Sequence, residues 1–168
     1  MILYHGSNQV VNVIDLSKCR PYKDFGRGFY LTSYIEQAKR MATRTARIYS
    51  GSPVVCIYEY NKDAVSGLNI KIFDEPNAEW AHFVMNNRNR YFKDIASTNC
   101  NTDAKFDIVV GPVANDDMVA LFREFETGVR SLDFLAESLK HPRQLTNQYS
   151  FHTTKATHTL TYKGVLNE

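Results

Sequence analysis

Two glycine-containing motifs near the N-terminus constrain this chain more than any other feature. Residues 3–7 read LYHGS, an apolar stretch that ends in His-Gly, and residues 24–32 read DFGRGFYLT. The second motif is a turn interrupted by Gly26 and Gly28, followed by a short apolar run that ends in a hydroxyl. Glycine tolerates backbone conformations and close contacts that other residues do not. The pair therefore predicts two short strands with polar groups at their ends, the second preceded by a tight loop.

The length and composition of the chain are those of one globular domain. Its 168 residues suffice for a sizeable core, and 43% of them are hydrophobic and 23% charged. No apolar run is long enough to span a bilayer, and the first residues lack the pattern of a signal peptide. We expect a single domain over residues 1–168, located in the cytoplasm. The three cysteines are expected to be free thiols, and no metal site is predicted because the histidines and cysteines lack zinc spacing.

Hydrophobic periodicity and turn residues predict intermixed strands and helices. We expect strands over residues 1–5, 54–60, 106–110 and 148–153, an edge strand over 160–162, and helices over about 34–49, 79–87, 132–139 and after Asn115 and Asp116. Ser33 and Glu36 have the spacing of a capping box for the first helix. Because strands and helices do not alternate regularly, the expected fold class is α+β. Leu31 stands where a dinucleotide fingerprint needs its third glycine, which excludes that motif.

A third motif, QYSFH at residues 148–152, lies late in the chain. With the two N-terminal motifs it resembles the signatures of the ADP-ribosyltransferase superfamily, in the branch with a His-Tyr-Glu triad that includes the poly(ADP-ribose) polymerases. Those signatures read x-His-Gly-Ser/Thr, Gly-x-Gly-Ile-Tyr-Phe and Glu-Tyr-x-Val-Tyr. Segments 37–39, 79–80 and 107–117 also resemble a small bacterial family of uncharacterised proteins grouped with these transferases, over nearly the whole chain. The resemblance implies an ADP-ribosyltransferase-like fold, a split antiparallel β-sheet with flanking helices.

The resemblance also implies that NAD is the co-substrate. The bond between nicotinamide and ribose is labile because a neutral pyridine amide leaves, and its rupture forms an oxocarbenium-like sugar, as in glycoside hydrolysis. His5 would hydrogen-bond a ribose hydroxyl, the Gly6 backbone would hold the carboxamide, and Tyr30 would stack on the ring. A structural histidine and an ordinary turn before a strand are the alternatives for these residues. The order and spacing of the three motifs favour the transferase.

Further contacts with NAD are expected close to the second motif. The family has a small residue eight positions after its tyrosine and a stacking aromatic three positions later, and here these are Ala38 and Met41. Ala38 would leave the nicotinamide floor open or belong to the helix core, whereas Met41 would form an apolar wall or, as we favour, belong to the core. Arg27 would bind the pyrophosphate or lie in solvent. The predicted NAD-binding set is completed by the other motif residues, Ser7, Gly26 and Gly28.

Gln148 stands where the family has its catalytic glutamate. Alternation along the strand places Gln148, Ser150 and His152 on one face and the two aromatic residues between them in the core. A glutamine carbonyl can accept a hydrogen bond from the ribose, but it carries no charge and takes no proton. We therefore expect single transfer or slow NAD hydrolysis rather than chain elongation, and expect Gln148→Glu to raise hydrolysis. Glu79 is a candidate for the missing base or a structural residue at a helix start.

The predicted function is an NAD-dependent mono-ADP-ribosyltransferase with His5, Tyr30 and Gln148 as catalytic residues. It would transfer ADP-ribose to a protein or nucleic-acid acceptor and release nicotinamide. Because small stand-alone bacterial transferases include toxins, the resemblance also implies a toxin-antitoxin pair with an antitoxin protein as partner. The alternatives are a non-catalytic sensor that binds NAD or ADP-ribose, an NAD glycohydrolase, and an RNA 2'-phosphotransferase, whose family has histidine in place of Tyr30.

The basic residues leave the nature of the acceptor open. The first helix has one basic side, and Arg88 and Arg90 flank Tyr91, so these residues could seat the phosphates of a nucleic acid. They could equally form a solvated face, with Glu36 and Arg40 paired at helical spacing. A formal net charge of +2 is too small to decide between the two interpretations.

Overall fold

The computed structural model describes residues 1–139 and 146–166, apart from the side chains of Asp116, Val119 and Ala136. In this part of the chain seven strands form one sheet, in the order β4-β5-β6-β2-β1-β3-β7. The strands are β1 (Ile2–Ser7), β2 (Phe29–Thr32), β3 (Val54–Tyr60), β4 (Ile70–Ile72), β5 (Ile108–Pro112), β6 (Asn147–Phe151) and β7 (Leu160–Val165). Neighbouring strands are antiparallel except for β4 and β5, which are parallel. The fold is α+β with a mixed sheet, so the expectation of a purely antiparallel sheet is wrong at this edge.

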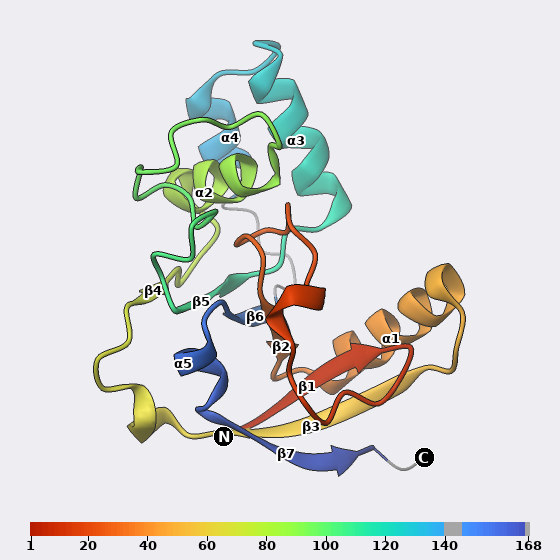
Figure 1. Ribbon diagram of the computed structural model, residues 1–168. Helices are drawn as coiled ribbons and strands as arrows, with labels where there is room; N and C mark the ends of the chain where they lie inside the picture. The colour runs from red at the N-terminus through yellow and green to blue at the C-terminus, as the bar shows by residue number, and fades with distance from the viewer. Residues whose placement is uncertain (140–145, 167–168) are drawn as a thin grey trace.

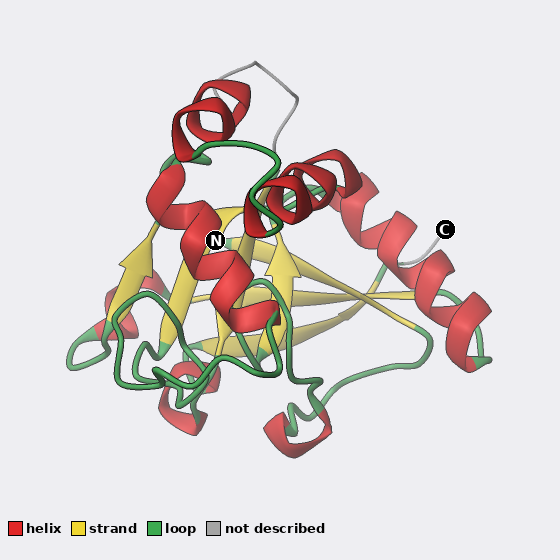
Figure 2. Ribbon diagram, turned by 90° about the horizontal axis from the view of Figure 1, so that it is seen from above, coloured by secondary structure: helices red, strands yellow, loops and turns green. Residues whose placement is uncertain are grey.

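The helices form two groups along the sheet (Figure 1). One group is α1 (Ile35–Tyr49), which packs on β1 and β3, and the other consists of α2 (Ala78–Arg88), α3 (Asp116–Glu126) and α4 (Leu132–Leu139) near β4–β6. A short helix, α5 (Thr154–Thr157), joins β6 to β7, and 3-10 turns cover Leu16–Lys18 and Lys62–Val65. The view from above shows the strands at the centre with helices around them (Figure 2). Among the described residues, no helix is long and apolar enough to cross a membrane.

Both helix groups lie on the same face of the sheet. The strand register places Tyr4, Thr32, Gln148 and Gly111 in one row across β1, β2, β6 and β5. Tyr4 packs in the core under α1, whereas a Cβ on Gly111 would point into the aromatic core under α2–α4. Residues of this face that lie between the two helix groups, Gln148 among them, are therefore enclosed from both sides.

Three apolar clusters hold the elements in place. The cluster beneath α2–α4 contains the fully buried Trp80 and Phe83, and the Trp80 ring nitrogen donates to the Pro112 carbonyl (3.2 Å). The cluster beneath α1 is small because the helix presents Ala38 and Ala42 to the sheet. The opposite face of the sheet carries the third cluster, which loop residues cover. Aromatic and β-branched residues of the strands fill it, as the pattern of β3 predicts.

Most predicted elements are confirmed, and the differences have local causes. The strand over residues 54–60 and the helix over 132–139 have the predicted bounds. The capping box is wrong: Tyr34 is the N-cap of α1 and makes no side-chain cap bond, while Glu36 pairs with Lys39 (3.1 Å) instead of Arg40. Sequence analysis missed β4, because a strand of three residues is too short to show an alternating pattern. The three cysteines are free thiols, as predicted.

Gly6 allows α1 to contact β1 directly. A Cβ at this position would lie 2.0 Å from the Ala38 carbonyl oxygen and 2.7 Å from the Ala42 nitrogen, both backbone atoms of the helix. We predict that Gly6→Ala lowers the free energy of unfolding by about 3 kcal/mol, because α1 must move off the sheet. Urea denaturation measures the change. Gly67→Ala is the control: no atom lies within 4 Å of its Cβ, so only its φ of +77° should cost about 1 kcal/mol. Equal losses for the two variants would contradict the close contact at Gly6.

Candidate functional site

The candidate site lies where β1 and β2 stop pairing. Along the described strands, β1 pairs with β3 throughout, but its ladder with β2 consists of the single pair Tyr4–Thr32. Met1 and Tyr60 exchange two hydrogen bonds (3.0 and 2.7 Å), and bonded pairs alternate in an antiparallel ladder. This alternation directs the N–H and carbonyl of Gly6 toward β2, beyond the last β1–β2 pair. The first motif thus turns a glycine backbone toward the space between the diverging strands.

The side chain of His5 bridges the diverging strands. Its Nδ1 lies 2.8 Å from the Tyr30 carbonyl oxygen, and its ring packs on Phe29 with centroids 4.3 Å apart. A carbonyl only accepts, so Nδ1 carries the proton and Nε2 keeps its lone pair. Burial lowers the pKa of His5 to about 4, the hydrogen bond to Tyr30 opposes this shift, and the nearby Lys23 charge adds to it. His5 is therefore neutral at pH 7 and can accept a hydrogen bond through Nε2. Ser7 ends the strand and is buried.

Tyr30 is held by the loop that precedes it. Its hydroxyl donates to the Gly26 carbonyl (2.7 Å) and accepts from the Phe25 N–H (3.0 Å). Burial, with a contribution from the Asp24 carboxylate, raises the pKa of Tyr30 well above its ordinary value. The hydroxyl therefore stays protonated and engaged, which leaves the ring as the part of Tyr30 able to contact a ligand. The Lys23 ammonium lies over that ring, 5.7 Å from its centroid, so a ligand stacked on this face must displace Lys23.

Gln148 lies on β6 next to β2. Its Cα partner on β2 is Thr32, and Tyr30 is the partner of Ser150, so the second and third motifs are adjacent in the sheet. The Gln148 side chain is 8% exposed. Its Nε2 donates to Asp24 Oδ2 (2.7 Å) and, more weakly, to the Pro112 carbonyl (3.4 Å). Gln148 is thus buried and hydrogen-bonded to a carboxylate.

Sequence analysis missed Asp24 as a site residue. Arg88 donates to Asp24 Oδ1 through Nε (2.9 Å) and Nη2 (2.6 Å), and the Ala114 N–H donates to Oδ2 (3.3 Å). Sequence analysis predicts that Arg88 either seats a nucleic-acid phosphate or lies in a solvated face, and its guanidinium is instead paired with Asp24. Asp24 opens the second motif, but no local pattern links it to Arg88 or Gln148, so the sequence contains no signal for this cluster.

The remaining polar residues on this face of β6 are also buried. Ser150 Oγ lies 2.8 Å from His152 Nε2, and His152 Nδ1 donates to the Arg27 carbonyl (2.7 Å). Burial lowers the pKa of His152 to about 4, although its hydrogen bond to Arg27 opposes the shift. A Cβ on Gly28 would lie 2.6 Å from His152 Nδ1. Gly28 therefore has a packing role, because it lets His152 reach the backbone of the second motif.

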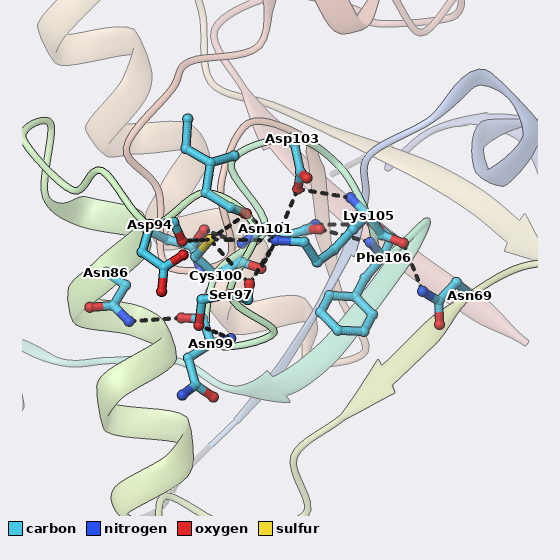
Figure 3. Close-up of polar contacts among 12 residues, drawn as sticks. Asn69, Asn86, Asp94, Ser97, Asn99, Cys100, Asn101, Asp103, Lys105 and Phe106 are labelled. Atoms are coloured by element: carbon cyan, nitrogen blue, oxygen red, sulfur yellow. Dashed lines mark hydrogen bonds and ion pairs between the residues drawn. The ribbon is translucent and has the colours of Figure 1, made fainter.

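An irregular loop, residues 89–107, is held by the network of polar contacts drawn in Figure 3. The Asn101 N–H donates to Asn87 Oδ1 of α2 (2.8 Å), which ties the loop to that helix. Gly26 adopts φ +91° and has no Cβ, which would lie 2.8 Å from the Asn101 carbonyl oxygen. The loop thus packs directly on Gly26, whose carbonyl holds Tyr30. The ammonium of Lys105 closes the loop by donating to the carbonyls of Ile95, Ser97 and Cys100.

Several predicted residues lie outside this cluster. Met41 is 41% exposed on α1, so its favoured assignment to the helix core is wrong. Ala38 is buried, but it packs against β1 at Gly6. The side chain of Arg27 is exposed, as a solvated loop charge would be. Glu79 pairs with Lys71 Nζ of β4 (2.7 Å), which favours the structural alternative for this residue.

Positive charge gathers beside His5 and Tyr30. Partial desolvation lowers the pKa of Lys23, Asp24 opposes this shift, and the guanidinium groups of Arg20, Arg44 and Arg88 lower it further. Arg20 packs over the Tyr49 ring, 4.0 Å from its centroid. Asp24 is already paired with Arg88. The excess of cations over carboxylates makes this region attractive to an anionic ligand.

A pocket of about 500 Å³ lies at the end of β5 and β6. Its lining includes Asp74, Glu75, Asn147 and Tyr149, but not His5, Tyr30 or Gln148. Asn147 and Tyr149 alternate with Gln148 along β6 and therefore face the opposite side of the sheet. The pocket is separate from the candidate site. Among the described residues, no group of three or more His, Cys, Asp or Glu side chains is placed to hold a metal ion.

Comparison with known proteins assigns a family without an activity. A family described as "Protein of unknown function (DUF3990)" matches residues 1–162, nearly the whole chain. The chain therefore belongs to the DUF3990 family. No curated protein and no solved structure matches it. The function has to be argued from the geometry of the site.

We predict that acid destabilises the protein through His5 and His152. Both have pKa values of about 4 in the folded chain. In the unfolded chain a histidine has a pKa of about 6.5, so between these values the unfolded state binds more protons. The free energy of unfolding should fall as the pH drops from 6.5 to 4, by at most about 3 kcal/mol for each histidine, and the histidine contribution should level off below that range.

Urea denaturation of wild type and His152→Gln at several pH values tests this prediction. The variant lacks one of the two titrating groups, so the stability difference between the proteins should shrink as the pH falls toward 4. A difference that stays constant from pH 7 to pH 4 would show that His152 is not held neutral by the fold. His158→Gln, at an exposed position, controls for the loss of a histidine in general.

Proposed function

We propose that this member of the DUF3990 family is an NAD-dependent mono-ADP-ribosyltransferase. The observation that carries the proposal is the meeting of its three motifs on three neighbouring strands. His5 and the Gly6 backbone lie on β1, Tyr30 on β2 and Gln148 on β6, in the sheet order β6-β2-β1. A chance set of short motifs has no reason to converge in this way. The convergence favours the ADP-ribosyltransferase-like fold that the motifs imply.

The groups at the site suit the chemistry of NAD cleavage. The bond from ribose C1′ to the nicotinamide nitrogen breaks, its electron pair neutralises the ring, and C1′ bonds to the acceptor. Because the leaving group is neutral, the enzyme mainly has to orient NAD and stabilise the oxocarbenium-like sugar. His5 Nε2 can accept from a ribose hydroxyl, and the Gly6 N–H and carbonyl can bind the carboxamide. The Tyr30 ring can stack on nicotinamide once Lys23 moves aside.

The cations beside the site suit the pyrophosphate of NAD. The charges of Arg20 and Arg44 act on Lys23, whose charge acts on His5, whereas Arg88 is neutralised by Asp24. Guanidinium groups bind phosphate in a bidentate manner, and a displaced Lys23 ammonium can follow the phosphate charge. We therefore assign the pyrophosphate to these cations in addition to Arg27.

The neutral amide of Gln148 restricts the acceptor. Without a carboxylate at this position, no proton can be taken from a ribose hydroxyl, which argues against chain elongation. The acceptor must be nucleophilic already or lose its proton to another base, and a side chain of a protein or a base of a nucleic acid can meet this requirement. A toxin neutralised by an antitoxin protein is consistent with such single transfer.

A non-catalytic NAD or ADP-ribose sensor is the second candidate. Two features of the site favour it. Gln148 is neutral, and Asp24, the neighbouring carboxylate, is fully hydrogen-bonded. Such a protein would bind NAD without releasing nicotinamide. Release of nicotinamide without labelling of a macromolecule would instead indicate an NAD glycohydrolase.

Nicotinamide release from NAD tests the enzyme assignment. We expect wild type to release nicotinamide and to label a macromolecule in a cell extract, and His5→Ala to release it about 100-fold more slowly, the usual scale for losing one aligned contact. Circular dichroism should show that the variant is folded. NAD binding by calorimetry with no release would support the sensor, and neither binding nor release would remove NAD from the proposal.

A pair of substitutions at Tyr30 separates its two roles. Tyr30→Ala removes the stacking ring and should weaken NAD binding by about 1–3 kcal/mol. Tyr30→Phe keeps the ring but leaves the Phe25 N–H and Gly26 carbonyl without their partner, so it should reduce stability by about 1–3 kcal/mol with little change in NAD affinity. Unchanged affinity in a folded Tyr30→Ala protein would exclude Tyr30 from the NAD site.

A further inference from the structure

We propose that Asp24 is a positioning residue that orients and polarises Gln148, and that it supplies the negative charge that residue 148 lacks. This inference rests on the proposed function, because it concerns the same site. It assigns Gln148 the contact with the ribose and Asp24 a role exerted through Gln148.

The hydrogen bonds of Gln148 fix the orientation of its amide. A carboxylate only accepts, so the NH2 group of Gln148 must face Asp24 (2.7 Å), and its other hydrogen is directed to the Pro112 carbonyl (3.4 Å). Both N–H groups are thus engaged. Within the described residues, no donor bonds to Gln148 Oε1. Toward the described part of the chain, the amide therefore presents one acceptor without a donor, and Asp24 decides which end of the amide this is.

The charge on Asp24 makes that acceptor stronger. A hydrogen bond from the amide N–H to a carboxylate draws electron density toward Oε1, and a buried site screens this effect less than water does. Asp24 is 8% exposed and Gln148 likewise 8%. Arg88 holds the opposite oxygen of the carboxylate through two hydrogen bonds, which keeps Asp24 in place. The carboxylate thus lies one hydrogen bond beyond the position where the family has its glutamate.

The same short loop also positions Tyr30. Asp24 binds Gln148, the next residue, Phe25, donates to the Tyr30 hydroxyl, and Gly26 accepts from it. Residues 24–26 therefore set the positions of two site residues that belong to different strands. Gln148 and Tyr30 are expected to respond together to any change in this loop.

The partnership explains why residue 148 is glutamine. A glutamate there would place a second carboxylate beside Asp24, at a position where the amide now donates across 2.7 Å. Two adjacent carboxylates repel, and one of them must take up a proton. The sequence led us to expect that Gln148→Glu raises NAD hydrolysis. With Asp24 in place, we now expect the single substitution Gln148→Glu to impair the enzyme. Combined with Asp24→Asn, the hydrogen bond forms again with its donor and acceptor exchanged.

A swap of the two side chains tests the proposal. We expect Asp24→Asn and Gln148→Glu each to lower kcat for nicotinamide release by about 10- to 100-fold, with the KM for NAD changed by less than about threefold. The double variant Asp24→Asn/Gln148→Glu should recover to within about threefold of the wild-type kcat. If Asp24 had only a structural role, kcat would not recover in the double variant, in which the negative charge has moved to residue 148.

Asp107→Asn is the matched control for loss of a hydrogen-bonded aspartate. Asp107 accepts from the Thr153 hydroxyl and from the Asn69 N–H, so its loss should lower the thermal midpoint and leave kcat unchanged. Two results would overturn the positioning role and leave the proposed function standing. One is a wild-type kcat in Asp24→Asn, and the other is a double variant whose kcat is no higher than that of Gln148→Glu. If Asp24→Asn does not fold, the comparison of Gln148→Glu with the double variant still decides. A wild type that releases no nicotinamide would overturn the proposed function and this inference together.

Discussion

The buried carboxylate of Asp24 is the interaction on which the rest of the site depends. It joins the second motif to α2 through Arg88, to the start of α3 through the Ala114 N–H, and to β6 through Gln148. An isolated buried charge costs several kcal/mol, so such a group persists only when it is paired and fully hydrogen-bonded. The four hydrogen bonds to Asp24 meet that condition. They also fix the loop that holds the Tyr30 hydroxyl, and so the carboxylate connects the core beneath α2–α4 with the centre of the sheet.

The other half of the site forms where the ladder between β1 and β2 ends. Beyond Tyr4–Thr32, the strands β1 and β2 are linked by the side chain of His5. Gly6 serves two purposes at this point. Its missing Cβ admits the backbone of α1, and the alternation of the ladder turns its N–H and carbonyl toward β2. Packing of a helix and exposure of backbone hydrogen-bonding groups therefore require the same residue.

The charge states of the site fit the proposed reaction, which needs orientation more than proton transfer. Burial keeps His5 neutral because its pKa is lowered to about 4, and it keeps Tyr30 protonated because its pKa is raised. Neither group exchanges a proton near pH 7. Lys23 and the neighbouring arginines supply positive charge instead. The proposed cleavage of the nicotinamide–ribose bond has a neutral leaving group, so it requires such fixed hydrogen bonds and a site that attracts the anionic NAD.

The sequence by itself determined the elements with strong periodicity and the motifs that meet in the sheet. The strand over residues 54–60 and the helix over 132–139 follow from local patterns, and Tyr30 and Gln148 lie on adjacent strands as the order of motifs implies. Only the tertiary structure decided the partners of those motifs. Asp24 meets Arg88 across 64 positions and Gln148 across 124, and Lys23 lies over the Tyr30 ring. Periodicity and caps depend on residues a few positions apart, whereas these contacts arise when the β2–β6 ladder and the packing of α2 bring distant segments together.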